Sequence, residues 1–401
     1  MAGSTAARLL AESGASVTVF EAGYGVGGRT STRTTRDGDS LAFDHGAQYI
    51  GPPKTEEFAR ALEGWRAGGF VREWRGRFAE VVGAISPGPE TTATTATSTT
   101  TRIIAEDPRS VENPRYVGYP SMNSICSNLL EHDNIDVVTR TRACASFDES
   151  SSSSPSMPRW SLTSHSDGRD LGRYDWLVGT DRLSATNGRA DLRDAPVSEF
   201  ADLVGPVESI PILALMVAFE SPLRGVPFDG IKFTDGGKGG GGFGGSLGWI
   251  ARDTSKPGRK RLDGKECWVI QSHLSAASEV ISSAGRDAGE DYEAKRELVR
   301  ERAKELLLTD FLRVIPELSR DKEATDIPNI IHSVGHRWSA AFPLLPPEGA
   351  GGDCYSDAEH NFIACGDYMG TRTGRVEGSF LSGRAAAFTL MDEVGTRGES
   401  R

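Results

Sequence analysis

The feature that most constrains how this chain can fold is a glycine-rich loop, Gly25-Val-Gly-Gly-Arg29, that follows a short apolar segment, Ser16-Val-Thr-Val-Phe20. The alternation in that segment predicts a β-strand. The residues before it, from about Ser4 to Ser13, have the periodicity of a helix that Gly14 ends. A helix, a strand and a glycine loop in this order are typical of the nucleotide-binding part of an α/β protein.

Gly3 and Glu21 fit two positions of the dinucleotide-binding signature. In that signature G-x-G-x-x-G lies between the first strand and its helix, and an acidic residue at the end of the second strand binds the adenosine ribose. Gly3 opens the predicted helix and Glu21 ends the strand 18 positions later, which suits the third glycine and the ribose carboxylate. Taken alone this is a weak signal, because one glycine and one glutamate recur by chance in many α/β proteins.

A second glycine loop so soon after the acidic residue indicates an FAD site rather than an NAD site. Such a loop lets the backbone approach the cofactor's pyrophosphate closely, and an arginine can pair with the phosphate charge. The segment Asp44-His-Gly-Ala-Gln-Tyr49 contains small residues, so its backbone could also come close to the cofactor. The predicted cofactor contacts from these two loops are Gly25, Gly27, Gly28, Arg29, Gly46, Ala47 and Gln48.

The C-terminal part carries a second flavin-like pattern. Ile363-Ala-Cys-Gly366-Asp367 predicts a strand that ends at a Gly-Asp turn, and a helix starts near Glu377-Gly378. Small residues at three- and four-residue spacing in that helix, including Gly383, predict close approach to a neighbouring backbone. The amides at its N-terminus could stabilise negative charge. Predicted contacts are Gly366, Asp367, Glu377 and Gly378, with Ala143 as a further one.

The rest of the chain alternates between helical and strand patterns. Phe58, Leu62 and Trp65 share one face of a predicted helix, and the strongest helical pattern spans about residues 291–314, with Pro316 predicted to mark its end. Strands are predicted at 135–138, 160–163, 176–178, 212–219, 268–272 and 362–365. Since helix and strand alternate near both termini, we expect an α/β nucleotide domain with a sheet-rich second domain inserted.

Together these motifs resemble the FAD-dependent amine-oxidase superfamily, and within it the renalase-like flavoproteins. The resemblance continues in blocks that keep the family order. These blocks are Tyr116-Val-Gly-Tyr-Pro-Ser-Met122, Pro227-Phe-Asp-Gly230, Trp249 to Arg259, Cys267-Trp-Val, His336-Arg-Trp338, Gly366-Asp367 and Arg375 to Gly383. They cover most of the chain outside three low-complexity segments.

The resemblance implies an α/β fold with a Rossmann-type FAD-binding domain and an inserted mixed-sheet α+β substrate domain, in a p-hydroxybenzoate-hydroxylase-like layout. The FAD-binding domain is expected at residues 1–55, 118–190 and 328–398. The substrate domain is expected at 56–117 and 191–327. FAD is expected to bind non-covalently, because the aromatic Tyr-Cys context of covalent flavin sites is missing near Gly366.

The expected reaction is hydride transfer from the substrate to flavin N5, with reoxidation by oxygen to hydrogen peroxide. The renalase resemblance implies a dihydronicotinamide isomer as substrate, and the superfamily equally allows an amine. No catalytic residue is assigned; His45 and Trp338 are candidates, and His332 and His336 could also contact the ring. Trp338 with Phe342 could form an apolar wall, with core packing as the alternative. Arg252 and Lys256 suit an anionic group such as phosphate, with a solvated loop as the alternative.

The chain departs from the family at its beginning, because the first hydrophobic strand and the first two glycines of the signature are missing. The simplest interpretation is a sequence truncated at its start. A true short form would leave a hole beside the central sheet. Two other readings stay open: an NAD(P)-dependent reductase with one nucleotide site, and a flavin-free remnant that binds partners or is inactive.

Composition excludes several classes of protein. The formal net charge of −11 and the absence of a basic block make nucleic acid a poor partner, and no segment approaches the roughly 18 apolar residues of a membrane span. Five cysteines without C-x-x-C support neither disulfides nor a zinc site, so no metal is expected. The expected partner is a small-molecule substrate, in the cytoplasm, or in an organelle if a transit peptide was lost. Residues 91–101, 150–156 and 236–245 are predicted to be mobile loops.

Overall fold

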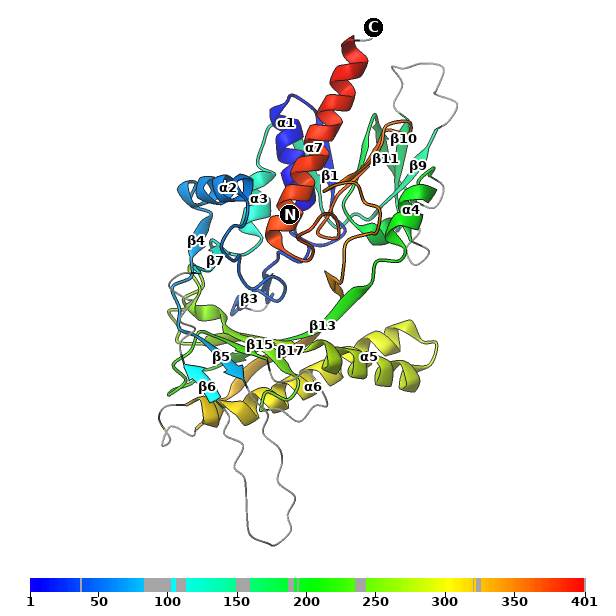
Figure 1. Cartoon of the computed structure of the whole chain (residues 1–401). Helices are drawn as coiled ribbons and strands as arrows, with labels where there is room; N and C mark the ends of the chain where they lie inside the picture. The colour runs from blue at the N-terminus through cyan, green and yellow to red at the C-terminus, as the bar shows by residue number, and fades with distance from the viewer. Residues whose placement is uncertain are drawn as a thin grey trace.

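The structure is a computed structural model that describes residues 1–36, 38–82, 102–105, 113–148, 159–186, 191–192, 195–234, 243–319, 321 and 326–399. The chain forms a mixed α/β fold, as the sequence predicts. Both ends of the chain lie in the part at the top of Figure 1, and a large sheet lies below it. The three segments predicted to be mobile loops lie outside the described residues, apart from 243–245.

The upper part begins with the predicted helix and strand. Helix α1 (Ala2–Glu12) is followed by Gly14 at φ +97°, a left-handed conformation that favours glycine and ends the helix. Strand β1 (Val17–Phe20) then pairs in parallel with β8 (Ile135–Val138), with Val17 opposite Ile135. The local sequence signals therefore predict the ends of α1 and β1 to within one or two residues of their observed positions.

A second small sheet lies in the same part. Strand β12 (Leu177–Gly179) pairs in parallel with β19 (Phe362–Ala364), which pairs antiparallel with β18 (Tyr355–Asp357). Helix α7 (Val376–Glu399) packs against α1, and a Cβ added at Gly383 would lie 2.2 Å from the carbonyl oxygen of Ala2. This contact is the close backbone approach that the small residues predict.

Further short elements surround these two sheets. A three-stranded meander packs its Trp160 against α4 and β19. Helix α2 buries Phe58, Leu62 and Trp65, the face that the periodicity predicts. The bounds are β2 (Arg33–Thr34), β3 (Ala42–Phe43), α2 (Glu56–Ala67), β4 (Val71–Glu73), β7 (Tyr116–Gly118), α3 (Ser124–Leu129), β9 (Ala143–Phe147), β10 (Trp160–Ser164), β11 (Asp170–Tyr174), η3 (Arg182–Ala185) and α4 (Ser198–Val204).

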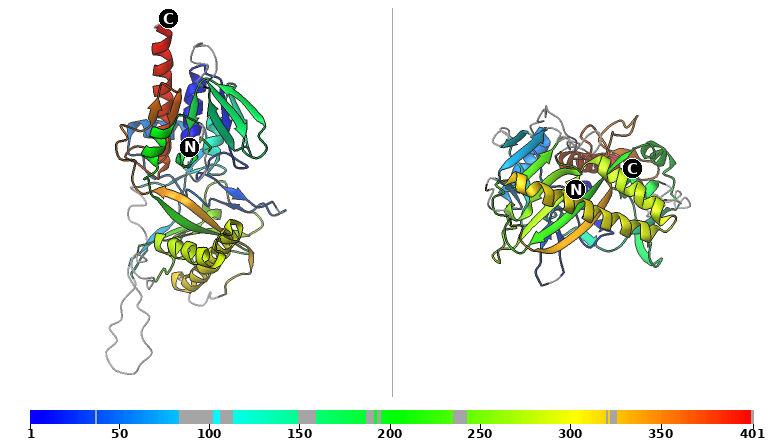
Figure 2. Two further views of the ribbon diagram at one scale, coloured as in Figure 1. Left: turned by 90° about the vertical axis from the view of Figure 1, so that its right-hand side faces the viewer. Right: turned by 90° about the horizontal axis from the view of Figure 1, so that it is seen from below.

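The lower part is a seven-stranded sheet in the order β17-β13-β16-β15-β14-β5-β6. Its strands are β5 (Phe78–Val82), β6 (Arg102–Ala105), β13 (Ser209–Phe219), β14 (Gly230–Phe233), β15 (Leu247–Arg252), β16 (Glu266–Ser272) and β17 (Ile330–Pro343), with the short helix η4 (Asp253–Ser255) after β15. Helices α5 (Leu274–Ala288) and α6 (Tyr292–Leu318) lie across its lower face, as Figure 2 shows from below.

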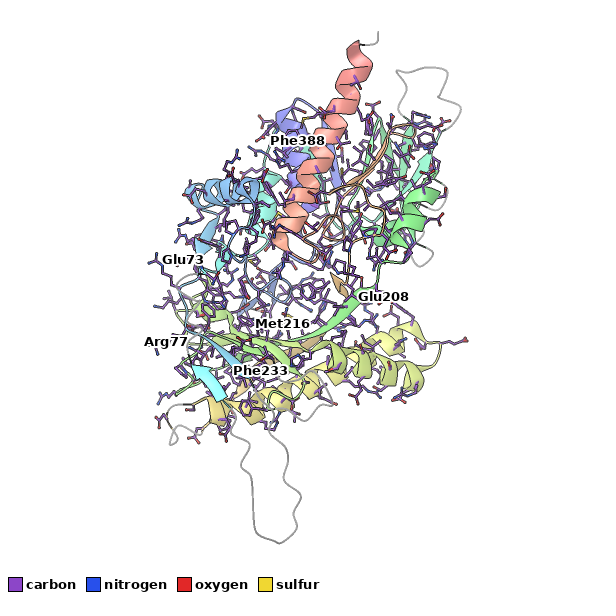
Figure 3. The ribbon with its side chains drawn as sticks, in the orientation of Figure 1. Glu73, Arg77, Glu208, Met216, Phe233 and Phe388 are labelled. Carbon is purple, nitrogen blue, oxygen red and sulfur yellow. The ribbon has the colours of Figure 1, made fainter. Side chains whose placement is uncertain are left out.

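The two faces of this sheet have different partners. Phe233 belongs to the large core between the sheet and the helices α5 and α6. Met216 lies on the opposite face and packs against Leu41 and Phe43, which come from the upper part (Figure 3). The sheet therefore has one face covered by its own helices and one face turned toward the upper part.

One detail differs from the sequence-based expectations, and a second bears on the expected domain boundaries. Pro316 lies inside α6, which continues to Leu318, because Val314, Ile315 and Leu318 are buried in the core of the lower part. Tertiary burial outweighs the helix-ending preference of proline here. The domain boundaries remain a prediction, but β17, which they assign to the FAD-binding domain, is hydrogen-bonded into the seven-stranded sheet.

Candidate cofactor and substrate site

One cavity of about 1880 Å³ runs between the two small sheets and reaches the seven-stranded sheet. Every residue of β1 and of β12 lines it, and so do parts of α1, α7 and β17. The two strands belong to separate sheets, and the cavity lies between them.

The facing edges of β1 and β12 present backbone groups to this cavity. Val17 N donates to Asn134 on the β8 side, and Leu177 N donates to Asn361 on the β19 side, each at 2.9–3.0 Å. A strand in a parallel sheet bonds each neighbour through alternate residues. The peptide groups of Thr18 and Val178, which lie between these bonds, therefore face the cavity.

The glycine loop has the conformations that require glycine. Gly27 has φ +121°, and a Cβ there would lie 2.4 Å from the carbonyl oxygen of Thr30, whose N–H donates to Gly27 O at 2.8 Å. Gly28 has φ +54°, and its missing Cβ points into open space. The loop is therefore a tight turn with bare backbone exposed to the cavity, a surface that suits a phosphate group.

Glu21 and Gly3 lie at one end of the cavity. The Glu21 carboxylate accepts a hydrogen bond from Gly23 N at 2.6 Å, which folds it back over the turn. Gly3 faces Thr180, whose Cγ2 would lie 3.1 Å from an added Cβ. Both positions line the cavity, as the dinucleotide signature expects of them.

Arg29 and Asp367 bind each other across the cavity. Arg29 Nη1 and Nη2 donate to Asp367 Oδ2 and Oδ1, both at 2.6 Å, and Nη1 also donates to Ala341 O at 3.1 Å. The Arg29 side chain is 40% exposed and that of Asp367 is 10% exposed. The two groups that the sequence assigns to the pyrophosphate and to the ribityl chain are thus brought into direct contact.

The loop 44–48 is held from several sides. Ala47 N donates to Arg29 O at 2.8 Å, and a Cβ at Gly46 would lie 2.0 Å from that same oxygen. From the lower sheet, Trp338 Nε1 donates to His45 O at 2.9 Å and Gln271 Nε2 donates to Gly46 O at 2.8 Å. The loop therefore joins the glycine loop to the seven-stranded sheet with little freedom to move.

Asp44 anchors this loop in a buried cluster of four charges. Lys256 Nζ lies 3.1 Å from Asp44 Oδ2 and 2.6 Å from Asp253 Oδ1, and Arg259 Nη2 lies 2.8 Å from Asp44 Oδ2. Asp44, Asp253 and Lys256 have no exposed side-chain surface. Burial alone would raise the pKa of Asp44, but Lys256 and Arg259 lower it below its ordinary value. Two carboxylates and two cations balance each other inside this cluster.

The prediction that Arg252 and Lys256 bind an anionic ligand is wrong. Lys256 is fully buried in the four-charge cluster. Arg252 pairs with Glu266 at 3.1 Å and with Asp229 at 3.4 Å. Both cations are therefore committed to carboxylates of the protein, and neither lines the cavity.

An aromatic cluster lies where the loop meets the sheet. The ring of His45 lies 5.0 Å from that of His336 and 5.0 Å from that of Trp338, and the latter two rings are 4.6 Å apart. Burial and the charge of Arg33 together lower the pKa of His45 to about 4, and burial, His45 and Arg33 together lower that of His336 to about 3. Both imidazoles are therefore neutral at neutral pH. His332 is separate, because it stacks on Phe43 at 5.5 Å.

The structure brings most of the predicted contacts to the cavity. Those that line it are Gly3, Glu21, Gly27, Gly28, Arg29, Gly46, Ala47, Ala143, Gly366 and Asp367, together with Trp338 and Phe342. Gly25, Gln48, His45 and Gly378 do not line it. Glu377 does not either, because its carboxylate accepts hydrogen bonds from Lys54 N at 3.0 Å and Thr55 Oγ1 at 2.9 Å.

Gln271 and Ile212 are cavity residues that the sequence does not reveal. They lie on β16 and β13, and Ile212 is paired with Trp338 of β17. Only the register of the sheet places them beside one another. Gln271 is a polar residue directly after the apolar run 267–270 of β16, and this was the available signal.

The arrangement fits an extended dinucleotide. Ordinary ligand pockets measure about 300–1000 Å³, and this cavity is larger and extends from Glu21 to the seven-stranded sheet. The glycine backbone at Gly27 and Gly28 and the cation Arg29 give the cavity wall donors of the kind that a diphosphate can accept from. Cys365, which follows β19, is buried and does not line the cavity.

Within the described ranges, no helix is both long and apolar enough to cross a membrane. The same residues include no group of three or more His, Cys, Asp or Glu side chains that could hold a metal ion.

The comparisons with known proteins agree with this architecture. Residues 1–63 match the family model of the NAD(P)-binding Rossmann-like domain. The chain is similar in fold to an oxidoreductase from Methanosarcina mazei (TM-score 0.57, 12% identity, 98% of each chain covered). It is also similar to a proposed protoporphyrinogen oxidase from Exiguobacterium sp. 255-15 (TM-score 0.57, 11% identity, 98% of this chain and 97% of that chain). At such identities the likeness concerns the fold, so this chain has the mixed α/β fold of these proteins, with a Rossmann-like NAD(P)-binding domain at its beginning.

Proposed function

We propose that this chain is an FAD-dependent oxidoreductase of the renalase-like, amine-oxidase type. The observation that carries the proposal is that one cavity collects the Gly27–Arg29 turn, Glu21 and the Gly366-Asp367 turn, which are far apart in the sequence. A site for NAD(P) alone would leave the Gly366-Asp367 turn without a role. The fold shared with an oxidoreductase structure supports the same class of protein.

Each part of the cavity has a role in this proposal. Glu21 would bind the adenosine ribose, the backbone of Gly27 and Gly28 with Arg29 would hold the diphosphate, and Asp367 would bind the ribityl chain. Bound FAD would supply the redox chemistry, taking hydride from a dihydronicotinamide isomer or an amine and being reoxidised by oxygen to give hydrogen peroxide. The chain's own tasks are to orient both molecules and to exclude water.

Arg29 and Asp367 must separate for this to occur. Their bidentate contact satisfies both groups in the absence of ligand. A diphosphate offers Arg29 the same planar, bidentate partner, and Asp367 then becomes available to accept hydroxyl hydrogen bonds. We therefore expect ligand binding to change the partner of Arg29 from Asp367 to the diphosphate, and to leave the Asp367 carboxylate as a hydrogen-bond acceptor for hydroxyl groups.

The test is the visible absorption spectrum of the purified chain after incubation with FAD and desalting. We expect retained flavin bands, and their loss in Arg29→Ala. Arg75→Ala is the matched control, since Arg75 is an exposed arginine outside the cavity. The same test is repeated with an apolar strand ending in G-x-G fused before Met1, because the edges of β1 and β12 face the cavity. Absence of flavin in both proteins would refute the proposal.

The NAD(P)-dependent reductase is the second candidate, because residues 1–63 match a domain named for NAD(P) binding. It predicts that NADPH or NADH protects the chain against thermal unfolding while FAD does not. A chain that binds neither nucleotide would be the flavin-free remnant.

A further inference from the structure

Two of the five cysteines lie opposite each other on neighbouring strands. Strands β18 and β19 pair antiparallel, with Tyr355 opposite Ala364. Cys354 directly precedes Tyr355, and Cys365 directly follows Ala364. Because the two strands run in opposite directions, the next pair on this register is Cys354 opposite Cys365.

The hydrogen bonds of β19 show which kind of pair this is. Cys365 N donates to Gly179 O of β12 at 2.9 Å, and β12 lies on the side of β19 away from β18. In an antiparallel ladder such a residue belongs to a non-hydrogen-bonded pair, whose Cα atoms lie about 4.5 Å apart. A disulfide spans Cα separations of about 4.4–6.8 Å. The register therefore brings Cys354 and Cys365 within the range of a disulfide.

Both side chains lie on the face of this small sheet that α7 covers. Cys365 belongs to a core cluster with Ala386 and Leu390 of α7, and Cys354 packs against the same cluster. Cys354 Sγ lies 3.6 Å from Thr389 Oγ1, also on α7. Burial and then the neighbouring thiol of Cys354 raise the pKa of Cys365 to about 12. The two sulfur atoms thus share one small apolar space between the strands and the helix.

The two thiols differ in their access to solvent. Cys365 has no exposed surface, whereas Cys354 is half-buried and follows the exposed residues 351–353. Burial raises the pKa of Cys354, and the hydroxyl group of Thr389 lowers it part of the way back. A small oxidant therefore reaches Cys354 first, and Cys365 stands behind it as a second thiol.

We propose that Cys354 and Cys365 form a dithiol that hydrogen peroxide closes to a reversible disulfide between β18 and β19. Both residues are free thiols in the structure. The sulfur of Cys354 attacks one peroxide oxygen, the O–O bond breaks, and a sulfenic acid and one water form. The sulfur of Cys365 then attacks that of Cys354, the S–O bond breaks, and a second water leaves. Two thiols thereby lose two electrons and two protons, and one peroxide becomes two water molecules.

The bond would form beside the Gly366-Asp367 turn of the cavity wall. Cys365 directly precedes this turn. A Cβ added at Gly370 would collide with the carboxylate of Asp353, so the loop after the turn packs against the residue before Cys354. Oxidation would therefore tie together two segments that already touch. If the chain is the oxidase that we propose, the oxidant is its own product.

The test is mass spectrometry of the full chain after treatment with hydrogen peroxide, with the remaining thiols blocked by N-ethylmaleimide in urea. No Lys or Arg lies between Arg337 and Arg372, so trypsin leaves both cysteines in the peptide 338–372. We expect this peptide to lose the mass of two hydrogen atoms and to carry no maleimide. Further cleavage after Glu359 should leave its two cysteine-containing fragments joined until dithiothreitol separates them.

Two results would overturn the proposal. One is a peptide 338–372 that still carries two maleimide groups after peroxide treatment. The other is Cys354 oxidised to a sulfinic or sulfonic acid while Cys365 stays a thiol, because a paired thiol should trap the sulfenic acid first.

Cys144 is the matched control within the same protein. It is also half-buried, but it lies opposite Thr163 of β10 rather than opposite a cysteine. Peroxide should therefore leave Cys144 out of every disulfide-linked peptide. A disulfide that joins Cys144 to Cys354 or Cys365 would show that the register does not decide the pairing, and the proposal would fail.

Two variants test the order of the steps. In Cys365→Ala, Cys354 should lose its thiol as fast as in the unmutated chain, and the product should be a sulfenic acid that dimedone labels. In Cys354→Ser, Cys365 should lose its thiol at least about ten-fold more slowly, because its burial excludes the oxidant. Equally fast loss of Cys365 in that variant would refute the proposed order.

The peptide map of the unmutated chain decides the proposal even if a variant fails to fold. Peroxide is added as a reagent, so the result does not depend on whether the chain binds FAD. Flavin retention tests the proposed function separately, and either proposal can fail while the other stands.

Discussion

Replacing Lys256 by methionine should cost this protein much of its stability. Lys256 Nζ is the cation shared by Asp44 and Asp253, and it also lies 5.1 Å from the ring of Trp74. Methionine keeps most of the side-chain volume and removes the charge. Two fully buried carboxylates are then left with one cation, Arg259.

The expected magnitude follows from this imbalance. Breaking a buried ion pair by removing one partner costs about 3–5 kcal/mol, because an uncompensated charge stays buried. Lys265→Met is the matched control, since Lys265 forms an exposed pair with Asp39, and exposed pairs contribute about 0–1 kcal/mol. The double variant Asp253→Asn/Lys256→Met leaves Asp44 facing Arg259, so it should be more stable than Lys256→Met alone.

Urea unfolding followed by tryptophan fluorescence measures these differences, with equal m-values as the condition for comparing midpoints. The reasoning fails if Lys256→Met loses no more stability than Lys265→Met. It also fails if the double variant is less stable than Lys256→Met alone. If each substitution only removed contacts, the two losses of stability would add. If charge balance decides stability, Asp253→Asn should instead recover part of the loss caused by Lys256→Met.

Three further results are expected. Gly46→Ala should cost about 1–3 kcal/mol in urea unfolding, because its Cβ would lie 2.0 Å from Arg29 O, whereas Gly51→Ala has open space and should cost less than about 0.5 kcal/mol. The folded pKa of His45, about 4, lies below its unfolded value near 6.5, so the unfolded state binds more protons and stability falls as the pH drops between these values; about 3 kcal/mol of that fall should be missing in His45→Gln. Burial raises the pKa of Cys365 to about 12, so mass spectrometry should find it unmodified by iodoacetamide in the native protein at pH 8 and modified in urea; native labelling would contradict its burial.

Local chemistry made part of this fold predictable from the sequence. A left-handed glycine ends α1, an alternating run makes β1, and a glycine turn follows it, and each of these depends on fewer than ten neighbouring residues. The small-residue pattern around Gly383 likewise predicted a close backbone contact, although the pattern could not reveal that Ala2 is the partner.

The charge partners could not be predicted, because they come from distant parts of the chain. Arg29 and Asp367 are separated by 338 residues and each was assigned to the cofactor, yet they bind each other. Lys256 was assigned to an anionic ligand because a sequence shows a cation without its counter-ions. A group of cavity residues on the seven-stranded sheet was hidden for a related reason, because only the register of three strands brings Gln271, His336 and Trp338 together.

The two ion-pair systems differ in a way that bears on binding. The cluster around Lys256 is fully buried, so breaking it leaves charges that no water can reach, and it serves as a fixed anchor for the loop 44–48. Arg29 is 40% exposed within the cavity, so an anionic ligand can reach it and replace Asp367 as its bidentate partner. The ion pairs around Lys256 thus lie where no ligand reaches, whereas the pair Arg29–Asp367 lies on the cavity wall where we propose that the diphosphate binds.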